Sequence, residues 1–177
     1  KQKKIEEIVL KVAIELARDG EGALFVIGKK VKYSRLLKQR FQKFSIFSSG
    51  SVKLLKSLAV IDGAIIINEN GQVLDYGAMI KNARPLKGYG TRHAAAVTAS
   101  KNGNRVILCS EEERKVKIFS DGKYVMQVDA LEKNVEKNVS EISEVLESIG
   151  IGTIGSLGAV TLVPTLGITL VPGIIVF

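Results

Sequence analysis

The sequence has one cysteine, one histidine and no tryptophan, and these scarcities exclude several kinds of site. The lone Cys109 excludes an internal disulfide framework and any cysteine-based zinc site, and it fits a reducing compartment. With His93 as the only histidine, a histidine-rich metal site is excluded too. Any bound metal would therefore use carboxylates and ligand oxygens, which favours Mg²⁺ or Mn²⁺. Aromatic residues make up 6% of the chain and are not interleaved with basic ones, so no specific nucleic-acid partner is expected.

The start of the chain lacks the apolar stretch of a secretory signal peptide. Lys1-Gln2-Lys3-Lys4 leads into an amphipathic segment instead, which predicts a cytoplasmic location.

Positive charge is concentrated in the first third of the chain. Residues 1–61 hold 14 Lys and Arg against 5 Asp and Glu, whereas residues 62–177 hold 12 against 13. This basic third could attract a polyphosphate, an anionic lipid or nucleic acid, or it could be an ordinary solvated surface.

Hydrophobic periodicity predicts an α/β domain. Apolar residues at helical spacing from Ile5 to Leu16 predict a first helix that ends near Gly20. Further helices are expected at 52–58, from Thr91 or Arg92 to Ser100, and at 131–149, and strands at 23–27, 58–61, 64–67, 72–80, 105–110, 116–120 and 124–128. The pairs Asn70-Gly71 and Asp121-Gly122 predict hairpin turns. This order indicates a mixed central β-sheet flanked by helices.

The last 30 residues, 148–177, carry no charged side chain, and a stretch of about 20 apolar residues can span a bilayer. Glycine and proline recur in this tail, as in the Thr-Leu-Val-Pro repeat at 161–164 and 169–172. Such punctuation favours turns or strands over one regular helix, although membrane helices tolerate both residues. Two alternatives stay open for the tail: contact with a membrane, or a buried or partner-covering segment.

Asp62-Gly63-Ala64 places one carboxylate between the charge-free run 57–61 and the apolar run 65–67. A charged side chain there would not contribute to packing of a hydrophobic core. One interpretation is a turn aspartate followed by a glycine with positive φ. The other is a metal-binding carboxylate near a ribose hydroxyl, with Gly63 allowing the backbone to approach a ligand.

Gly90-Thr91-Arg92-His93 carries the only histidine, beside an arginine, at the start of a predicted helix. A glycine at a helix N-terminus leaves backbone N–H groups for an anion, to which Thr91 adds a hydroxyl. Arg92 adds a planar fork for phosphate oxygens, and His93 can donate to the same group. The alternative for His93 is a neutral histidine with a structural hydrogen bond at the helix cap.

A run of acidic residues, Ser110-Glu111-Glu112-Glu113, follows the predicted strand at 105–110. A solvated acidic loop is one interpretation of three glutamates in a row. The other is that they hold a divalent cation against phosphates together with Asp62.

In this order and spacing, Asp62-Gly63-Ala64, Gly90-Thr91-Arg92-His93 and Ser110-Glu111-Glu112 resemble the diadenylate cyclase domain, which makes cyclic di-AMP. The resemblance covers about residues 5–130, and the alanines after His93 are similar to the archaeal branch. It implies a catalytic domain at 1–147, followed by the tail at 148–177. It also implies self-association, with two domains face to face and each holding one ATP and a divalent metal, Mn²⁺ or Mg²⁺. The 3′-hydroxyl of each ATP then attacks the α-phosphorus of the other, and two pyrophosphates leave.

The resemblance implies a role for each motif residue. Asp62 binds metal and helps to activate the 3′-hydroxyl, while Gly63 and Ala64 shape the nucleotide pocket. The triphosphate is held by Gly90, Thr91, Arg92 and His93, with Ser110 on phosphate oxygens and Glu112 as a second metal ligand. The adenine lies against Gly77, Ala78, Met79 and Ile80.

One departure separates this chain from the bacterial pattern, which reads Arg-His-Arg where this chain has Ala94 after the histidine. One cationic contact is therefore missing, or it has moved to Lys87, Lys101 or Arg114. This loss defines the alternative function, a non-catalytic adenine-nucleotide sensor that keeps the pocket without turnover. A third hypothesis is a membrane-associated binding module in which the basic third and the tail matter most.

Overall fold

The computed structural model describes residues 1–38, 40–150 and 167–175. The helices are α1 (Gln2–Arg18), α2 (Ser51–Ala59), α3 (Thr91–Ser100) and α4 (Val139–Gly150), with short 3₁₀ helices η1 (Lys101–Gly103) and η2 (Val135–Asn138). The strands are β1 (Ala23–Ile27), β2 (Tyr33–Arg35), β3 (Phe44–Ser45), β4 (Ala64–Ile67), β5 (Gln72–Ile80), β6 (Arg105–Ser110), β7 (Lys115–Ser120), β8 (Lys123–Asp129) and β9 (Ile168–Ile175).

The strands form one mixed sheet in the order β2-β5-β4-β1-β6-β7-β8-β9, with β3 paired to β5. The β1–β4 pair is parallel, and the other pairs are antiparallel. Phe25 in the centre of β1 lies opposite Ile65 of β4 and Ile107 of β6. The predicted mixed sheet flanked by helices is confirmed.

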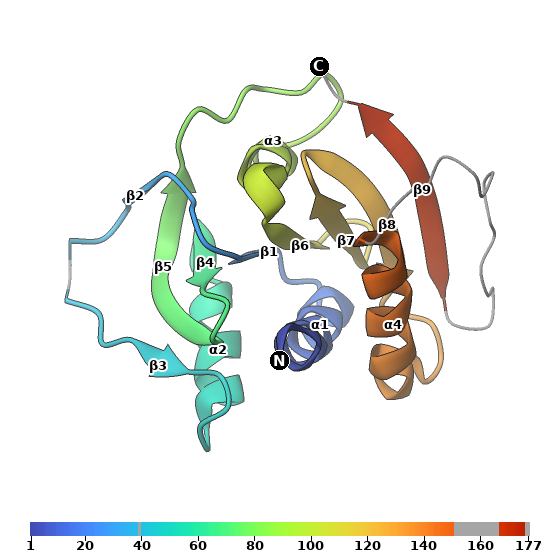
Figure 1. The fold of residues 1–177 in the computed structure, drawn as a ribbon, viewed down its shortest axis with the longest axis horizontal. Helices are drawn as coiled ribbons and strands as arrows, with labels where there is room; N and C mark the ends of the chain where they lie inside the picture. The colour runs from blue at the N-terminus through green and yellow to red at the C-terminus, as the bar shows by residue number, and fades with distance from the viewer. Residues whose placement is uncertain (39, 151–166, 176–177) are drawn as a thin grey trace.

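Helices cover both faces of the sheet, which explains why β1 is a continuous apolar run (Figure 1). Phe25 and Ile27 point into the core under α1, α2 and α4, while Leu24 and Val26 pack with the small residues of α3 on the opposite face. The alanines of α3 let this helix lie close to the sheet, and its first turn faces the loop that follows β5 (Figure 1).

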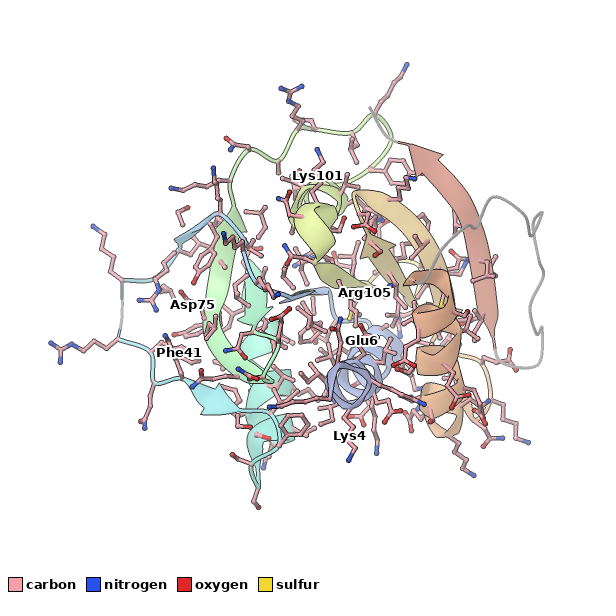
Figure 2. The ribbon with its side chains drawn as sticks, in the orientation of Figure 1. Lys4, Glu6, Phe41, Asp75, Lys101 and Arg105 are labelled. Atoms are coloured by element: carbon pink, nitrogen blue, oxygen red, sulfur yellow. The ribbon has the colours of Figure 1, made fainter. Side chains whose placement is uncertain are left out.

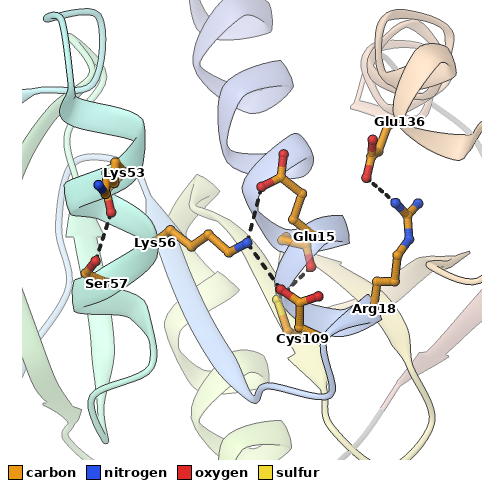
Figure 3. Close-up of polar contacts among 9 residues, drawn as sticks. Glu15, Arg18, Lys53, Lys56, Ser57, Cys109 and Glu136 are labelled. Atoms are coloured by element: carbon orange, nitrogen blue, oxygen red, sulfur yellow. Dashed lines mark hydrogen bonds and ion pairs between the residues drawn. The ribbon is translucent and has the colours of Figure 1, made fainter.

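Polar contacts tie the helices of the first face together. The ammonium of Lys56 on α2 lies 3.4 Å from Glu15 and 3.2 Å from Asp19 at the end of α1 (Figure 3). In the same view, Arg18 of α1 pairs with Glu136 of η2. Because these side chains are partly exposed, each pair contributes little free energy, on the order of 0–1 kcal/mol.

A buried ion pair joins α1 to β6, the strand that ends at Ser110. Arg105 Nε lies 3.4 Å from Glu6 Oε1, and Glu6 is 2% exposed (Figure 2). Burial raises the pKa of the Glu6 carboxyl, and the positive charge of Arg105 opposes this shift. The pair fixes α1 against β6, because removing either partner would leave an uncompensated buried charge.

Two predicted elements are wrong in part. Residues 58–59, predicted as the start of a strand at 58–61, belong to α2, and Leu55, Leu58 and Ala59 face the core at helical spacing. Val60 and Ile61, which follow the helix, are 44% and 36% exposed. A short apolar run does not by itself distinguish a strand from the end of a helix.

The helix expected from residue 131 begins as α4 only at Val139. The N–H of Leu131 donates instead to the side chain of Asp129, and Asn134 has a left-handed backbone with φ of 64°. Both features are turn geometry, so the helix cannot start before them.

Part of the apolar tail is a strand. β9 pairs antiparallel with β8, and Ile168 is buried in the core. Residues 151–166, on which much of the membrane alternative rests, lie outside the described residues. Within the described parts of the chain, none of the helices is both long enough and apolar enough to cross a membrane.

Candidate functional site

The first turn of α3 is an uncapped helix start. Gly90 is its N-cap residue, and the Gly90 carbonyl accepts hydrogen bonds from the N–H groups of His93 at 3.1 Å and Ala94 at 3.3 Å. Among the described residues no side chain caps this turn, so the N–H groups of Thr91 and Arg92 have no partner within the helix. Free N–H groups and the positive end of the helix dipole together favour an anion here.

A cavity of about 230 Å³ lies on one side of this turn. We call it the apolar cavity: its walls include residues 62–64 at the start of β4, 78–80 at the end of β5, and 89–92 at the start of α3, with Leu24, Pro85 and Ala95. Its one carboxylate is that of Asp62, which is exposed and accepts a hydrogen bond from the Gly63 N–H at 3.1 Å.

A second cavity of about 370 Å³ lies on the other side of the same turn. We call it the acidic cavity, and its walls are residues 88–93 and 108–113. The two cavities share residues 89–92, so the helix start borders both of them. The fold therefore brings the three sequence motifs to one place, although they are far apart in the sequence.

Arg92 is the cation shared by both cavities. Its Nη1 lies 3.8 Å from a carboxylate oxygen of Glu111, and its side chain is 36% exposed. A Cβ at Gly22 would lie 2.3 Å from this Nη1, so the glycine leaves the space that the guanidinium occupies. A pair this long leaves most of the guanidinium donors free for a ligand.

His93 lines the acidic cavity and contacts Lys117 of β7, whose Nζ lies 3.2 Å from His93 Nε2. Burial lowers the pKa of the imidazole, Lys117 lowers it further, and Glu113 opposes the shift. The rings of Tyr89 and Phe119 lie 5.2 and 6.3 Å from the imidazole, centroid to centroid. His93 is thus a neutral, packed ring rather than a free cation.

Gly63 and Gly77 carry a close backbone contact beneath Asp62. Gly63 has φ of 100°, and a Cβ there would lie 2.5 Å from the carbonyl carbon of Gly77. Gly77 also has positive φ, and its Cα would lie 2.8 Å from the same Cβ position. Gly77 alone among the predicted site residues lines neither cavity, and its place beside the adenine stays a prediction.

We expect Gly63→Ala to lower the free energy of unfolding by about 3 kcal/mol, because positive-φ strain and the overlap with Gly77 add. Gly50→Ala is the matched control, since Gly50 has φ of 75° but nothing within 4 Å of its Cβ position. That control should cost only about 1 kcal/mol. Urea denaturation of both variants measures the difference, and equal losses would contradict the close contact.

Carboxylates flank the helix start on both sides. Of the three acidic-cavity glutamates, Glu111 approaches Arg92, Glu113 pairs with Lys117, and Glu112 makes no ion pair within the described residues. Asp62 lines the other cavity, so one chain does not bring Asp62 and Glu112 into a single cavity.

The carboxylates near the start of α3 could bind a divalent cation only together with a ligand that supplies further oxygen atoms. In residues 1–38, 40–150 and 167–175, no group of three or more His, Cys, Asp or Glu side chains could hold a metal. Mg²⁺ and similar hard cations need only one or two carboxylates when substrate phosphates supply further oxygens. Asp62 and Glu112 meet that requirement by their chemistry.

None of the three residues considered as the place of a second cation lines either cavity. Arg114 Nη1 donates to the Arg18 carbonyl at 2.6 Å, away from both cavities. Lys101 follows the opposite end of α3, where its stem packs near Gly122. Lys87 is exposed in the loop before α3 and lines neither cavity.

Lys117 is the polar residue that the motifs did not reveal. It is 5% exposed and contacts both His93 and Glu113. The sequence signal for Lys117 is its position four residues after Glu113. That spacing does not reveal the contact with His93, which depends on β7 lying beside α3.

Comparisons with known proteins find a matching family model and a relative. The family model DAC, described as DisA bacterial checkpoint controller nucleotide-binding, matches residues 11–124. A relative from Methanocaldococcus jannaschii named diadenylate cyclase is 32% identical over 144 residues, which are 73% of this chain and 47% of the relative. This chain therefore spans about half the length of that relative.

A solved structure shares the fold. The crystal structure of a double mutant of DacA from Staphylococcus aureus superimposes with a TM-score of 0.52 at 23% identity, over 84% of this chain and 97% of the other.

Proposed function

The chain belongs to the DAC family of nucleotide-binding domains, and from this premise we propose that it is a diadenylate cyclase, which condenses two ATP molecules into cyclic di-AMP and two pyrophosphates. The observation that carries the proposal is the helix start of Gly90 and Arg92 between two cavities, one apolar and one acidic. The role of each residue below is part of the proposal.

One ATP occupies both cavities. Neither cavity alone reaches far into the range of about 300–1,000 Å³ that is typical of small-molecule sites. The adenine lies in the apolar cavity against Ala78, Met79 and Ile80, and the triphosphate crosses the start of α3. There Thr91 and Arg92 donate to phosphate oxygens, with His93 and Ser110 reaching them from the acidic cavity. This arrangement matches apolar walls to the base and donors to the anion.

Asp62 in the apolar cavity and Glu112 in the acidic cavity would each be a carboxylate ligand for a divalent cation, Mn²⁺ or Mg²⁺, that enters with the phosphates. When bound, the cation neutralises charge that develops on the phosphate oxygens. Asp62 also polarises the 3′-hydroxyl, whose oxygen bonds to the α-phosphorus of the second ATP. The bond from that phosphorus to the bridging oxygen breaks, the hydroxyl proton leaves to solvent, and pyrophosphate departs. Catalysis is then mainly positioning and charge neutralisation.

The second ATP comes from a second copy of the chain. Asp62 is exposed at the rim of the apolar cavity, where it can meet a nucleotide held by another molecule. Large apolar side chains are exposed nearby: Leu36, Val60, Ile61 and Met79 are 50%, 44%, 36% and 44% exposed. Exposed apolar groups of this kind favour a protein contact.

The rate of cyclic di-AMP formation should rise with the square of the enzyme concentration well below the dimer dissociation constant. Above that constant the rate should become proportional to concentration, because every active site is then assembled. Product formation and sedimentation measured over the same dilution series test this. A rate proportional to concentration throughout a verified monomer–dimer transition would exclude face-to-face catalysis.

A further inference from the structure

Lys117 is a buried lysine between the sheet and α3. It lies in the middle of β7, where it is 5% exposed, and its ammonium makes three contacts. It pairs with the carboxylate of Glu113, lies 3.2 Å from His93 Nε2, and is 5.9 Å from the centre of the Tyr124 ring. Lysine is almost never buried without partners, so this placement needs an explanation.

The contact with His93 fixes the position of one proton. An ammonium group can only donate hydrogen bonds, so His93 Nε2 must accept from Lys117 and cannot carry hydrogen. The neutral ring then carries its hydrogen on Nδ1. In the described part of the chain no protein group accepts from Nδ1, and Nδ1 is not among the buried polar atoms that lack a partner. His93 lines the acidic cavity, so a ligand in that cavity is the available acceptor for this N–H.

We propose that Lys117 is a positioning residue that holds His93 in the Nδ1–H form, so that the ring donates one directed hydrogen bond to an anion in the acidic cavity. That the anion is a phosphate group of ATP rests on the proposed function. Glu113 neutralises Lys117, so the cluster of three side chains orients a donor without adding net charge.

Two further observations support this role. The pKa of His93 is lowered, first by burial and then by Lys117, which keeps the ring neutral near pH 7. Tyr89 and Phe119 pack beside the imidazole and limit its rotation, so that Nδ1 keeps its direction.

The single histidine makes the test direct. A long-range ¹H–¹⁵N spectrum of the uniformly labelled protein, carrying no histidine tag, reports the two ring nitrogens of His93 without assignment. We expect the Nδ1–H form to be the major neutral form. In Lys117→Met the Nε2–H form should become the major one, and the dissociation constant for ATP should rise about tenfold, as expected for one lost hydrogen bond to a charged group.

Two matched variants complete the experiment. Lys115→Met removes a lysine from the same strand and the same face, and it should leave both the tautomer and ATP binding unchanged. Lys117→Arg keeps a cation that only donates, and it should retain the Nδ1–H form. If Lys117→Met does not fold, the spectrum of the unsubstituted protein still decides, because a major Nε2–H form there overturns the assignment. An unchanged tautomer in folded Lys117→Met overturns it as well.

The outcomes separate this inference from the proposed function. A chain that makes cyclic di-AMP with His93 in the Nε2–H form refutes the role of Lys117 alone. A chain with His93 in the Nδ1–H form that makes no cyclic di-AMP refutes the cyclase and supports the tautomer assignment.

Discussion

Asp62→Asn is expected to reduce cyclic di-AMP formation by about 10³-fold, the size of effect typical when a group that handles a reacting proton is lost. Asparagine keeps the shape of the side chain but loses the charge that holds a cation and polarises the 3′-hydroxyl. The fold should not change, because Asp62 is exposed and the asparagine carbonyl can still accept from the Gly63 N–H. ATP binding through the start of α3 should therefore stay within about threefold, since that site is intact.

Glu69→Gln is the matched control for this substitution. Glu69 is an exposed carboxylate in the hairpin turn between β4 and β5, whereas Asp62 precedes the other end of β4. Neutralising Glu69 removes the same charge from the same hairpin without touching either cavity, so activity should be retained. Equal activity of Asp62→Asn and Glu69→Gln would remove Asp62 from the reaction.

Arg92→Ala is expected to weaken ATP binding by about 10- to 100-fold, because hydrogen bonds to charged groups contribute about 1.5–3 kcal/mol. The guanidinium borders both cavities and is held by Glu111 only at 3.8 Å, so its removal costs the fold little. Arg92→Lys should recover part of the affinity, since an ammonium keeps the charge but not the planar fork. Calorimetric titration with a non-hydrolysable ATP analogue measures the three affinities.

Arg84→Ala serves as the control for Arg92. Arg84 is exposed in the loop between β5 and α3 and lines neither cavity. Its removal lowers the net charge by the same amount, so it reports any general electrostatic attraction of ATP. If both alanine variants bind ATP equally, Arg92 is not a phosphate ligand.

Local sequence predicted most of the elements and the start of the site helix. The β1 run has no polar residue because both faces of this strand are covered, and Gly90 before Thr91 marks where α3 begins. Twelve predicted site residues line the two cavities, although their roles stay predictions. The exception, Gly77, has positive φ and packs against Gly63, a contact between β5 and the segment before β4 that no local pattern encodes.

Contacts between distant segments account for what the sequence could not predict. Lys117 and His93 meet because β7 pairs with β6 and α3 packs over both strands, and neither fact is visible in a local window. The strand predicted at 58–61 was wrong because a short apolar run suits both a strand and the end of a helix. The face of α2 that holds Leu55 against the core resolves this ambiguity.

The most direct test of the account is the product that the unsubstituted chain forms from ATP with Mn²⁺ or Mg²⁺. Cyclic di-AMP and pyrophosphate can be measured in the same reaction by chromatography and an enzymatic pyrophosphate assay. The account predicts two pyrophosphates for each cyclic di-AMP, with Asp62→Asn giving almost none of either. ATP that binds at the start of α3 but yields no cyclic di-AMP with either metal, at concentrations where the chain is dimeric, would contradict it and favour a nucleotide sensor.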